Sequence, residues 1–127
     1  MNDNHYQQNL YMKINLTITG CMGRMGQQLI KSSNKNKNFK LVSLTENFRI
    51  NKKINNILPE FNDVNSFKKT NVIIDFTVPK CTLEVLKIAS KLKKRVVIGT
   101  TGFTKNQEIL IKKYSKKIPI LKAGNMS

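Results

Sequence analysis

Three glycines near the start of the chain are the residues whose type and spacing most clearly point to chemistry. The segment that contains them is Gly20-Cys21-Met22-Gly23-Arg24-Met25-Gly26. Glycine allows a tight turn and lets backbone N–H groups approach an anion, and a helix that follows turns its positive end toward the same place. Such a turn suits the pyrophosphate of a dinucleotide, although a strand-to-helix turn can also need glycine for steric reasons alone.

An acidic residue stands at the distance from this turn that ribose recognition requires. Glu46 follows Gly26 by 20 residues and comes directly after a predicted strand. In dinucleotide-binding βαβ units, a carboxylate about 20 residues after the glycines accepts a hydrogen bond from the adenosine ribose. The alternative is an ordinary surface carboxylate, but only 7 of the 127 residues are acidic. Turn and carboxylate together favour a nucleotide site.

Three other residues have side chains that could take part in chemistry. Two of them also have a simpler explanation, and the third lies outside any predicted element. Arg24 could bond a phosphate through two guanidinium N–H groups, or it could be a solvated residue on a first helical turn. Cys21 could have a lowered pKa near the helix start, or it could be a small side chain that fills a tight turn. His5 is the only histidine and lies in a segment without pattern, so we assign it no role.

The elements that must position these residues alternate between short apolar strands and amphipathic helices. Strands are predicted at residues 13–19, 39–45, 71–76, 95–100 and 118–122. Helices are predicted at residues 24–33, 79–92 and 104–116, the last opened by a Thr-x-x-Gln capping box. This alternation is typical of a parallel sheet with helices on both faces. The sequence therefore predicts an α/β fold, a Rossmann-like doubly wound parallel sheet.

The chain has room for one domain of ordinary size. We expect a flexible tail at residues 1–11, which are rich in Asn and Gln, and a dinucleotide-binding domain at residues 12–127. The polar stretch 46–70 shows no clear periodicity. Within it, four apolar side chains are expected to pack on the core, namely Ile54, Ile57, Leu58 and Phe61.

The formal net charge is +16, from 23 Lys and Arg against 7 Asp and Glu. A basic domain attracts nucleic acid through counterion release. Only Arg24, Arg49 and Arg95 are arginines, however, whereas base recognition favours the bidentate guanidinium group. The abundance of lysine and asparagine fits codon bias in an AT-rich genome instead, so a nucleic-acid partner is not expected.

Membrane, disulfide and metal functions find no support in the sequence. No segment approaches the roughly 18 apolar residues of a membrane span, and the first residues lack the apolar stretch of a secretory signal. Cys21 and Cys81 are too few for a disulfide framework or a four-ligand zinc site. We expect a cytoplasmic protein without a metal.

Four motifs follow one another at the carboxyl ends of predicted strands, where open α/β sheets bind ligands. They are G-x-x-G-R-M-G at residues 20–26, Asp-Phe-Thr at 75–77, Gly-Thr-Thr-Gly-Phe at 99–103 and Ala-Gly-Asn-Met-Ser at 123–127. In order and spacing, the chain resembles the dihydrodipicolinate reductase (4-hydroxy-tetrahydrodipicolinate reductase) family from about residue 12 to residue 127. Several motifs in register are far more specific than one glycine turn.

The resemblance implies a site for a nicotinamide dinucleotide, NAD or NADP, which supplies a hydride in its reduced form. The residues that would surround the pyrophosphate are Gly20, Cys21, Met22, Gly23, Arg24 and Met25, with Glu46 on the ribose. The residues that would border the nicotinamide are Phe76, Gly99, Thr100 and Thr101, completed by Ala123, Gly124, Asn125 and Met126. Phe76 as plain core is an equal alternative, and Thr101 could be a plain turn residue.

The resemblance also implies a reaction, the reduction of a small cyclic dicarboxylate, dihydrodipicolinate, in lysine and diaminopimelate biosynthesis. The substrate-binding and catalytic residues of the family lie in a second domain that we do not find in this chain. We therefore expect the cofactor-binding half, with no catalytic residue and no reductase activity alone, from an enzyme that forms homo-oligomers. Some relatives carry an arginine for the 2′-phosphate of NADP where this chain has Asn47, although Arg49, Lys52 and Lys53 lie nearby. NADH is expected to be used at least as well as NADPH.

Two functions of other classes stay open on the sequence alone. One is a nucleotide-binding module that reduces nothing, and the other is a basic nucleic-acid-binding domain on a Rossmann-like scaffold. Among enzymes, semialdehyde dehydrogenases have a similar G-x-x-G turn but need a catalytic cysteine in a later domain. The Asp-Phe-Thr and Gly-Thr-Thr-Gly-Phe motifs favour the reductase.

Overall fold

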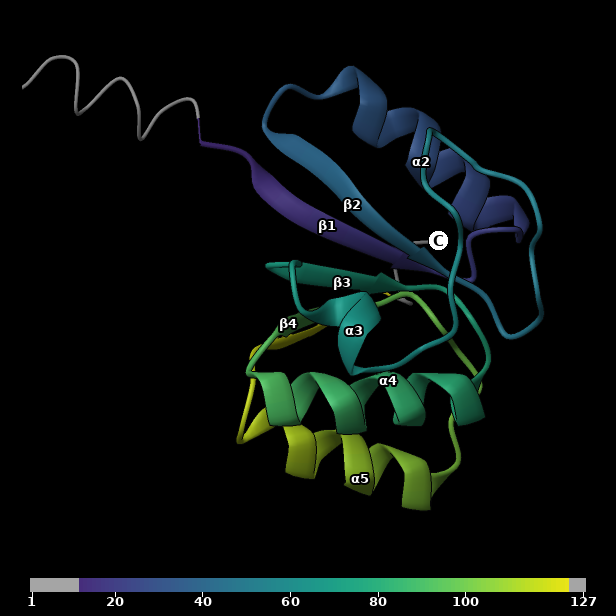
Figure 1. Cartoon of the computed structure of the whole chain (residues 1–127). Helices are drawn as coiled ribbons and strands as arrows, with labels where there is room; N and C mark the ends of the chain where they lie inside the picture. Colours follow the sequence, from purple (N-terminus) through teal and green to yellow (C-terminus); the bar gives the residue numbers. More distant parts are fainter. Residues whose placement is uncertain (1–11, 124–127) are drawn as a thin grey trace, which may run out of the picture.

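Five parallel strands form a single sheet in the computed structural model, which describes residues 12–123 (Figure 1). The tail expected at residues 1–11 and the site residues Gly124, Asn125 and Met126 lie outside the described residues. The strands are β1 (Ile14–Thr19), β2 (Phe39–Thr45), β3 (Val72–Asp75), β4 (Arg95–Ile98) and β5 (Ile120–Lys122). Their order in the sheet is β2-β1-β3-β4-β5. The predicted α/β class and parallel sheet are confirmed.

The connections between the strands are helical and lie on two sides of the sheet. The helices are α2 (Arg24–Lys35), α3 (Val64–Phe67), α4 (Pro79–Leu92) and α5 (Lys105–Ser115). Figure 1 shows α2 on one face and α3, α4 and α5 on the other. Within residues 12–123, α2 packs on β1 and β2 alone, and no described helix covers the same face of β3 and β4. The prediction of helices on both faces is therefore confirmed. On the α2 side, however, the described helices leave the β3 and β4 half of the sheet uncovered.

The helices begin and end at residues whose types or conformations favour helix starts and helix ends. Pro79 occupies the first turn of α4, where its missing N–H costs no hydrogen bond. Lys93 ends that helix in the left-handed conformation, with φ of 58°. The predicted capping box of α5 is confirmed, because the Thr104 side chain accepts from the Gln107 N–H and the Gln107 side chain accepts from the Thr104 N–H.

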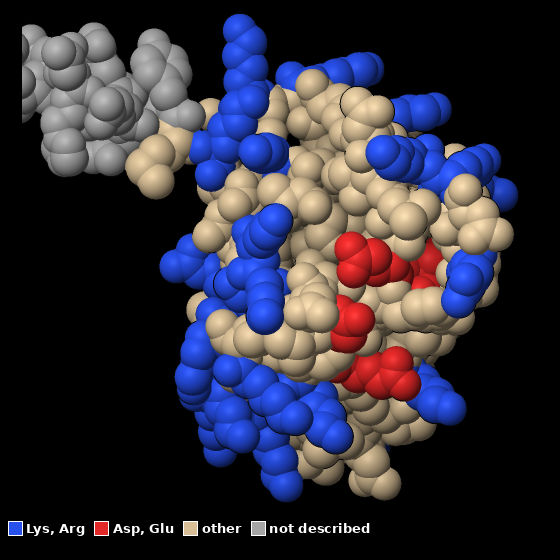
Figure 2. Space-filling model, viewed as in Figure 1, with Lys and Arg blue, Asp and Glu red and all other residues tan. Residues whose placement is uncertain are grey.

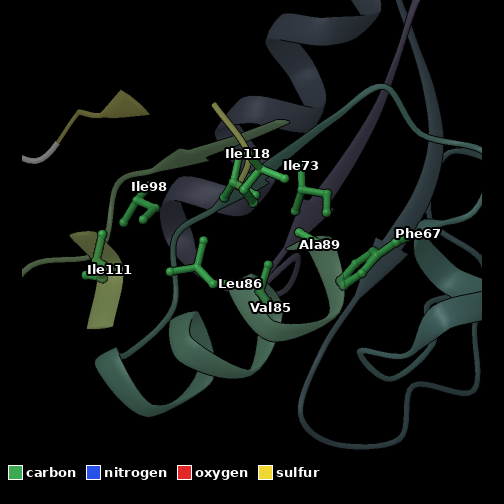
Figure 3. Packing of buried hydrophobic residues seen from close by; sticks show 9 residues of the cluster. Phe67, Ile73, Val85, Leu86, Ala89, Ile98, Ile111 and Ile118 are labelled. Carbon is green, nitrogen blue, oxygen red and sulfur yellow. The ribbon is translucent and has the colours of Figure 1, made fainter. Parts of the chain in front are cut away.

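Two apolar clusters, one on each face of the sheet, form the core. The larger joins β3 and β4 to α3, α4 and α5, and its buried members are Phe67, Ile73, Val85, Leu86, Ala89, Val96, Ile98, Ile111 and Ile118 (Figure 3). The smaller joins β1 and β2 to α2, through Ile18, Cys21, Ile30 and Leu44. Because side chains alternate along a strand, neighbouring residues of β1 and β3 contribute to opposite faces.

The stretch 46–70 is the part that the sequence predicted least well. It contains a short helix, α3, that we did not predict, with Asp63 as its N-cap: the Asp63 carboxylate accepts from the Ser66 N–H at 2.8 Å. Ile54 and Ile57 are half-buried against the smaller cluster, as expected. The prediction was wrong for Leu58 and Phe61, which are each 50% exposed. Apolar residues in a long loop can meet solvent, and composition alone does not distinguish them.

Strand ends differ from the prediction by one or two residues, most clearly after β4. The strand predicted over 95–100 ends at Ile98, and Gly99 and Thr100 leave the ladder to turn across the carboxyl edge. The last strand begins at Ile120 instead of residue 118, although Ile118 is buried in the larger cluster. The residues released from β4 contribute to the candidate site.

A buried threonine in β1 provides a test of the packing. Thr17 is fully buried, and its hydroxyl has no hydrogen-bond partner among the described residues. An unsatisfied buried hydroxyl costs roughly 1–3 kcal/mol, and valine has the same shape. We expect Thr17→Val to raise the free energy of unfolding by about 1 kcal/mol. Urea denaturation followed by circular dichroism measures it, and a destabilised variant would show that the hydroxyl is hydrogen-bonded.

Candidate functional site

A crevice opens at the carboxyl edge of the sheet between β1 and β3. At this place the strand order reverses, because the chain adds β2 on one side of β1 and then crosses over to add β3 on the other side. Open α/β sheets bind their ligands at such a switch point. The crevice has a volume of about 210 Å³, and its lining residues are Gly20, Gly23, Glu46, Asn47, Asn62, Phe76, Thr77, Val78 and Cys81. This volume is below the roughly 300–1,000 Å³ of enclosed ligand pockets, so a dinucleotide would lie along the edge.

The glycine turn packs so closely that side chains would not fit. Gly20 has φ of +64°, and a Cβ there would lie 2.6 Å from the Phe76 carbonyl oxygen. A Cβ on Gly26 would lie 2.2 Å from the Gly20 carbonyl oxygen, inside any allowed contact. The turn is closed by the Gly23 N–H, which donates to Gly20 O at 3.0 Å. The glycines at positions 20 and 26 therefore let the first turn of α2 approach the end of β1.

The start of α2 has unpaired backbone donors. Gly23 is its N-cap and offers no side chain, and the Gln27 N–H is the first to donate within the helix, to Gly23 O. Among the described residues, no side chain caps this helix and its first turn has no acidic residue. The N–H groups of Arg24, Met25 and Gly26 thus have no acceptor within the helix and lie at the positive end of its dipole. These donors and the absence of an acidic residue from the first turn of α2 fit a phosphate group.

Arg24 and Met25 lie on the solvent side of this first turn. Both are exposed, Met25 to 46%, and no ion pair holds Arg24 among residues 12–123. The sequence left open whether Arg24 bonds a phosphate or is solvated, and its position permits both. Met22 is half-buried, and its carbonyl accepts from the Gln27 side chain at 2.9 Å.

Glu46 connects the end of β2 to the glycine turn. Its carboxylate accepts from the Met22 N–H through Oε2 and from the Asn47 N–H through Oε1, both at 3.0 Å. The side chain is 91% buried and still lines the crevice, and each oxygen keeps a lone pair. The predicted ribose acceptor therefore lies beside the predicted phosphate turn. Its role in binding stays a prediction.

Asn62 lines the crevice next to Glu46, and the sequence analysis missed it. The loop after β2 returns along that strand, since the Glu46 N–H donates to Glu60 O and the Glu60 N–H donates to Leu44 O. This return brings Asn62 to the crevice, and its buried Oδ1 has no hydrogen-bond partner among the described residues. No local pattern could have found it, because the placement depends on a bridge between Thr45 and Glu60.

Phe76 and Gly99 form a second contact between neighbouring strand ends. A Cβ on Gly99 would lie 1.9 Å from the Phe76 ring, so the ring rests directly on the Gly99 backbone. Phe76 is half-buried and lines the crevice, so it is not simply a core residue. The Gly99 N–H donates to Asp75 O at 2.8 Å. Phe76 and Gly99 thus make one continuous surface, and its role as a wall beside the nicotinamide stays a prediction.

Asp75 is a second residue to which the sequence analysis gave no role, although it placed the Asp-Phe-Thr motif at the end of a strand. It is fully buried at the end of β3, and its carboxylate accepts hydrogen bonds from threonine hydroxyls of four chain segments. The donors are Thr19, Thr77, Thr82 and Thr100. The signal that could have revealed it is an acidic residue at the end of an otherwise apolar strand. Thr101, by contrast, is exposed, and Ala123 is half-buried, with its N–H bonded to Ile98 O at 2.7 Å.

Both cysteines have raised thiol pKa values, which opposes a nucleophilic role. Burial, with the Glu46 charge as a smaller cause, raises the pKa of Cys21 to about 11. Burial also raises the pKa of Cys81, with the Glu84 charge adding to it. Cys21 is thus the small residue that fills the turn, and the alternative of a lowered pKa was wrong. Within residues 12–123, no group of three or more metal-ligating side chains occurs.

The charges are unevenly placed around the crevice. Figure 2 shows the visible acidic side chains grouped on one part of the face and the Lys and Arg side chains around them. Glu46 lines the crevice, and its lining contains no Lys or Arg. The crevice is therefore not a basic groove of the kind that holds a nucleic-acid backbone. In the part of the chain that the structure describes, no helix is long and apolar enough to cross a membrane.

A parallel sheet, a glycine turn at its switch point and an acidic residue after the second strand define the class, a nucleotide-binding domain of the Rossmann type. The sequence model described as "Dihydrodipicolinate reductase, N-terminus" matches residues 14–126. The chain therefore belongs to the dihydrodipicolinate reductase family, of which it matches the N-terminal domain. The resemblance found in the sequence is confirmed.

Individual relatives agree with this assignment. The chain is 73% identical over 115 residues to the 4-hydroxy-tetrahydrodipicolinate reductase of Pelagibacter ubique, covering 91% of this chain and 45% of that protein. The solved structure of dipicolinate-bound dihydrodipicolinate reductase from Paenisporosarcina sp. TG-14 superposes with a TM-score of 0.70 at 28% identity, covering 90% of this chain and 48% of that chain. The homoserine dehydrogenase of S. aureus has a TM-score of 0.69 at 16% identity, over 90% of this chain and 33% of that chain, and shares the fold. The chain spans about half the length of the curated relatives it matches.

Proposed function

We propose that this chain binds a nicotinamide dinucleotide and is the cofactor-binding half of a 4-hydroxy-tetrahydrodipicolinate reductase. The observation that carries the proposal is the contact of Gly26 with Gly20 O, where a Cβ would lie at 2.2 Å. That contact holds the uncapped start of α2 against the end of β1, as a pyrophosphate site requires. The reaction would be reduction of a cyclic dicarboxylate in lysine and diaminopimelate biosynthesis, with the hydride supplied by the bound cofactor.

The residues of this chain would bind and orient the cofactor in three places. The N–H groups at the start of α2, from Arg24 to Gly26, would hold the phosphates. Glu46 would accept from the ribose hydroxyls with its remaining lone pairs. Phe76 on Gly99 would form one wall beside the nicotinamide and exclude water from it. The proposed setting is the cytoplasm, and the whole enzyme is proposed to be a homo-oligomer.

The acceptors in the crevice favour NADH over NADPH. Glu46 and the unpartnered Asn62 Oδ1 both accept hydrogen bonds, which suits hydroxyl donors and opposes a 2′-phosphate. Asn47 is exposed beside them and carries no charge. Arg49, Lys52 and Lys53, which we considered as substitutes, are exposed and absent from the lining of the crevice. NADH is therefore expected to bind at least as tightly as NADPH.

Glu46→Gln tests the binding site and the preference together. We expect the affinity for NADH to fall about tenfold, because a hydrogen bond to a charged acceptor is worth roughly 1.5–3 kcal/mol. NADPH should lose less, because removal of the carboxylate charge also removes repulsion of its 2′-phosphate. Isothermal titration calorimetry with both coenzymes measures the change in their affinity ratio.

A matched control replaces a carboxylate outside the crevice. Glu108 is exposed on α5 and does not line the crevice, so Glu108→Gln should leave the ratio of the two affinities unchanged. If the folded, unmodified chain gave no heat with either coenzyme at millimolar concentration, the proposed function would be rejected. A strong preference of the unmodified chain for NADPH would reject only the proposed role of the acceptors in coenzyme choice and would leave the proposed function standing.

A further inference from the structure

A fully buried carboxylate lies directly behind the wall of the crevice. Asp75 is 0% exposed, and both of its oxygens are occupied: Oδ1 accepts from Thr19 at 2.6 Å and from Thr77 at 2.9 Å. Its Oδ2 accepts from Thr100 at 3.0 Å and from Thr82. Within residues 12–123, no Lys or Arg forms an ion pair with it. Four hydroxyl donors therefore hold this charge.

The four donors come from four different elements of the carboxyl edge. Thr19 ends β1 and Thr82 lies in the first turns of α4. Thr77 follows β3, and Thr100 follows β4. In the sheet register, Asp75 pairs with Thr19 of β1 on one side and with Ile98 of β4 on the other. A single side chain thus connects the ends of three adjacent strands and the start of a helix.

Stability does not by itself explain a carboxylate at this place. Burial of a charge carries a large desolvation cost, and well-packed apolar residues are often as stabilising as a buried polar group. The neighbouring larger cluster shows that this face accepts apolar side chains, since Ile98 is the register partner of Asp75 and Ile73 precedes Asp75 by two residues on β3. An apolar residue at position 75 could not accept hydrogen bonds, so it would not fix the orientation of the four threonine hydroxyls.

Those contacts fix the two segments that form the wall. The Thr100 hydroxyl donates to Asp75 and accepts from the Thr77 N–H at 2.9 Å. The Asp75 main chain adds a bond from the Gly99 N–H at 2.8 Å. With the Phe76 ring against Gly99, the segments 76–77 and 99–100 are joined by side chain, main chain and packing. Neither segment can shift without breaking a bond to Asp75.

We propose that Asp75 is a positioning residue that fixes the wall formed by Phe76, Gly99 and Thr100 for the nicotinamide half of the cofactor. The inference rests on the proposed function. It predicts that Asp75 contributes to the binding of the nicotinamide ring and not to that of the adenosine and phosphate groups. In the proposed function those groups would be held by the glycine turn and Glu46, which form no direct hydrogen bond with Asp75.

The test compares two ligands in the Asp75→Asn variant of the full chain. NADH carries the nicotinamide ring, whereas ADP-ribose has the same adenosine and phosphate groups without it. We expect the affinity for NADH to fall about tenfold and that for ADP-ribose to stay unchanged, both by calorimetry. A role in stability alone would weaken both ligands by the same factor, and this result would overturn the inference.

Thr100 supplies a second pair of variants in case Asp75→Asn does not fold. Thr100→Ser keeps the hydroxyl that donates to Asp75, so its loss of NADH affinity should be much smaller than that of Thr100→Val. Thr100→Val removes the hydroxyl and should weaken NADH alone; equal behaviour of these two variants overturns the inference. Thr17→Val changes a buried threonine whose hydroxyl has no bond to Asp75, and it should leave both affinities unchanged. Binding of neither ligand by the unmodified chain would instead reject the proposed function.

Discussion

Gly26→Ala is expected to abolish measurable dinucleotide binding and to destabilise the domain. The new Cβ would lie 2.2 Å from the Gly20 carbonyl oxygen and 2.9 Å from Cys21 Cα, and both neighbours are backbone atoms. The start of α2 must therefore move away from the end of β1. Overpacking of this kind costs roughly 1–3 kcal/mol. Calorimetry with NADH measures the affinity, and urea denaturation measures the stability.

The sign of the change in stability distinguishes the steric clash from the effect of helix propensity. Position 26 lies inside α2, where helix propensity alone would make alanine about 1 kcal/mol better than glycine. Gly23→Ala is the matched control: its φ is −70°, and the nearest atom to a new Cβ is Gly20 O at 3.3 Å. That variant should lose less stability than Gly26→Ala, although its new methyl group would lie at the edge of the crevice. A Gly26→Ala protein of raised stability and normal affinity would contradict the proposed site.

Phe67→Ala is expected to cause the largest loss of stability. Phe67 is the largest fully buried side chain among the described residues, and it attaches the end of α3 to the larger cluster, of which it is a member (Figure 3). Truncation of a buried phenylalanine costs roughly 3–5 kcal/mol, against a total of about 5–15 kcal/mol for a domain. Urea denaturation monitored by circular dichroism should show a midpoint far below that of the unmodified chain.

An exposed phenylalanine provides the control for this truncation. Phe48 is 52% exposed, and Phe48→Ala should change the free energy of unfolding by no more than about 0.5 kcal/mol. Equal losses for the two variants would mean that the α3 side of the core is not packed as described. Because α3 follows the loop that brings Asn62 to the crevice, weaker NADH binding is also expected for Phe67→Ala.

The sequence was sufficient for the parts of the fold that local signals determine. The strand 39–45 was predicted with its observed bounds, and the capping box at Thr104 and Gln107 located the start of α5. In both places, short-range pattern and tertiary packing agree. The glycine turn was found for the same reason, since the steric demand of the backbone is visible as missing side chains.

The rest of the site depends on contacts between distant segments. Asn62 reaches the crevice only through the bridge between Thr45 and Glu60, which composition does not reveal. The four hydroxyls around Asp75 are brought together by the sheet register, since Thr19 is 56 residues away in the chain. Leu58 and Phe61 were misplaced because a loop without periodicity gives no inward direction.

The hydrogen bond from the Met22 N–H to Glu46 has a consequence for engineering. In the proposed site, one carboxylate would hold the turn beneath the phosphates and offer its free lone pairs to the sugar, so the two recognition tasks would be thermodynamically coupled. Substitutions at position 46 that are intended to redirect the domain toward a phosphorylated coenzyme will also loosen the loop that every dinucleotide needs. Their effects will be non-additive with changes in the glycine turn, and a successful redesign will have to supply a new acceptor for the Met22 N–H.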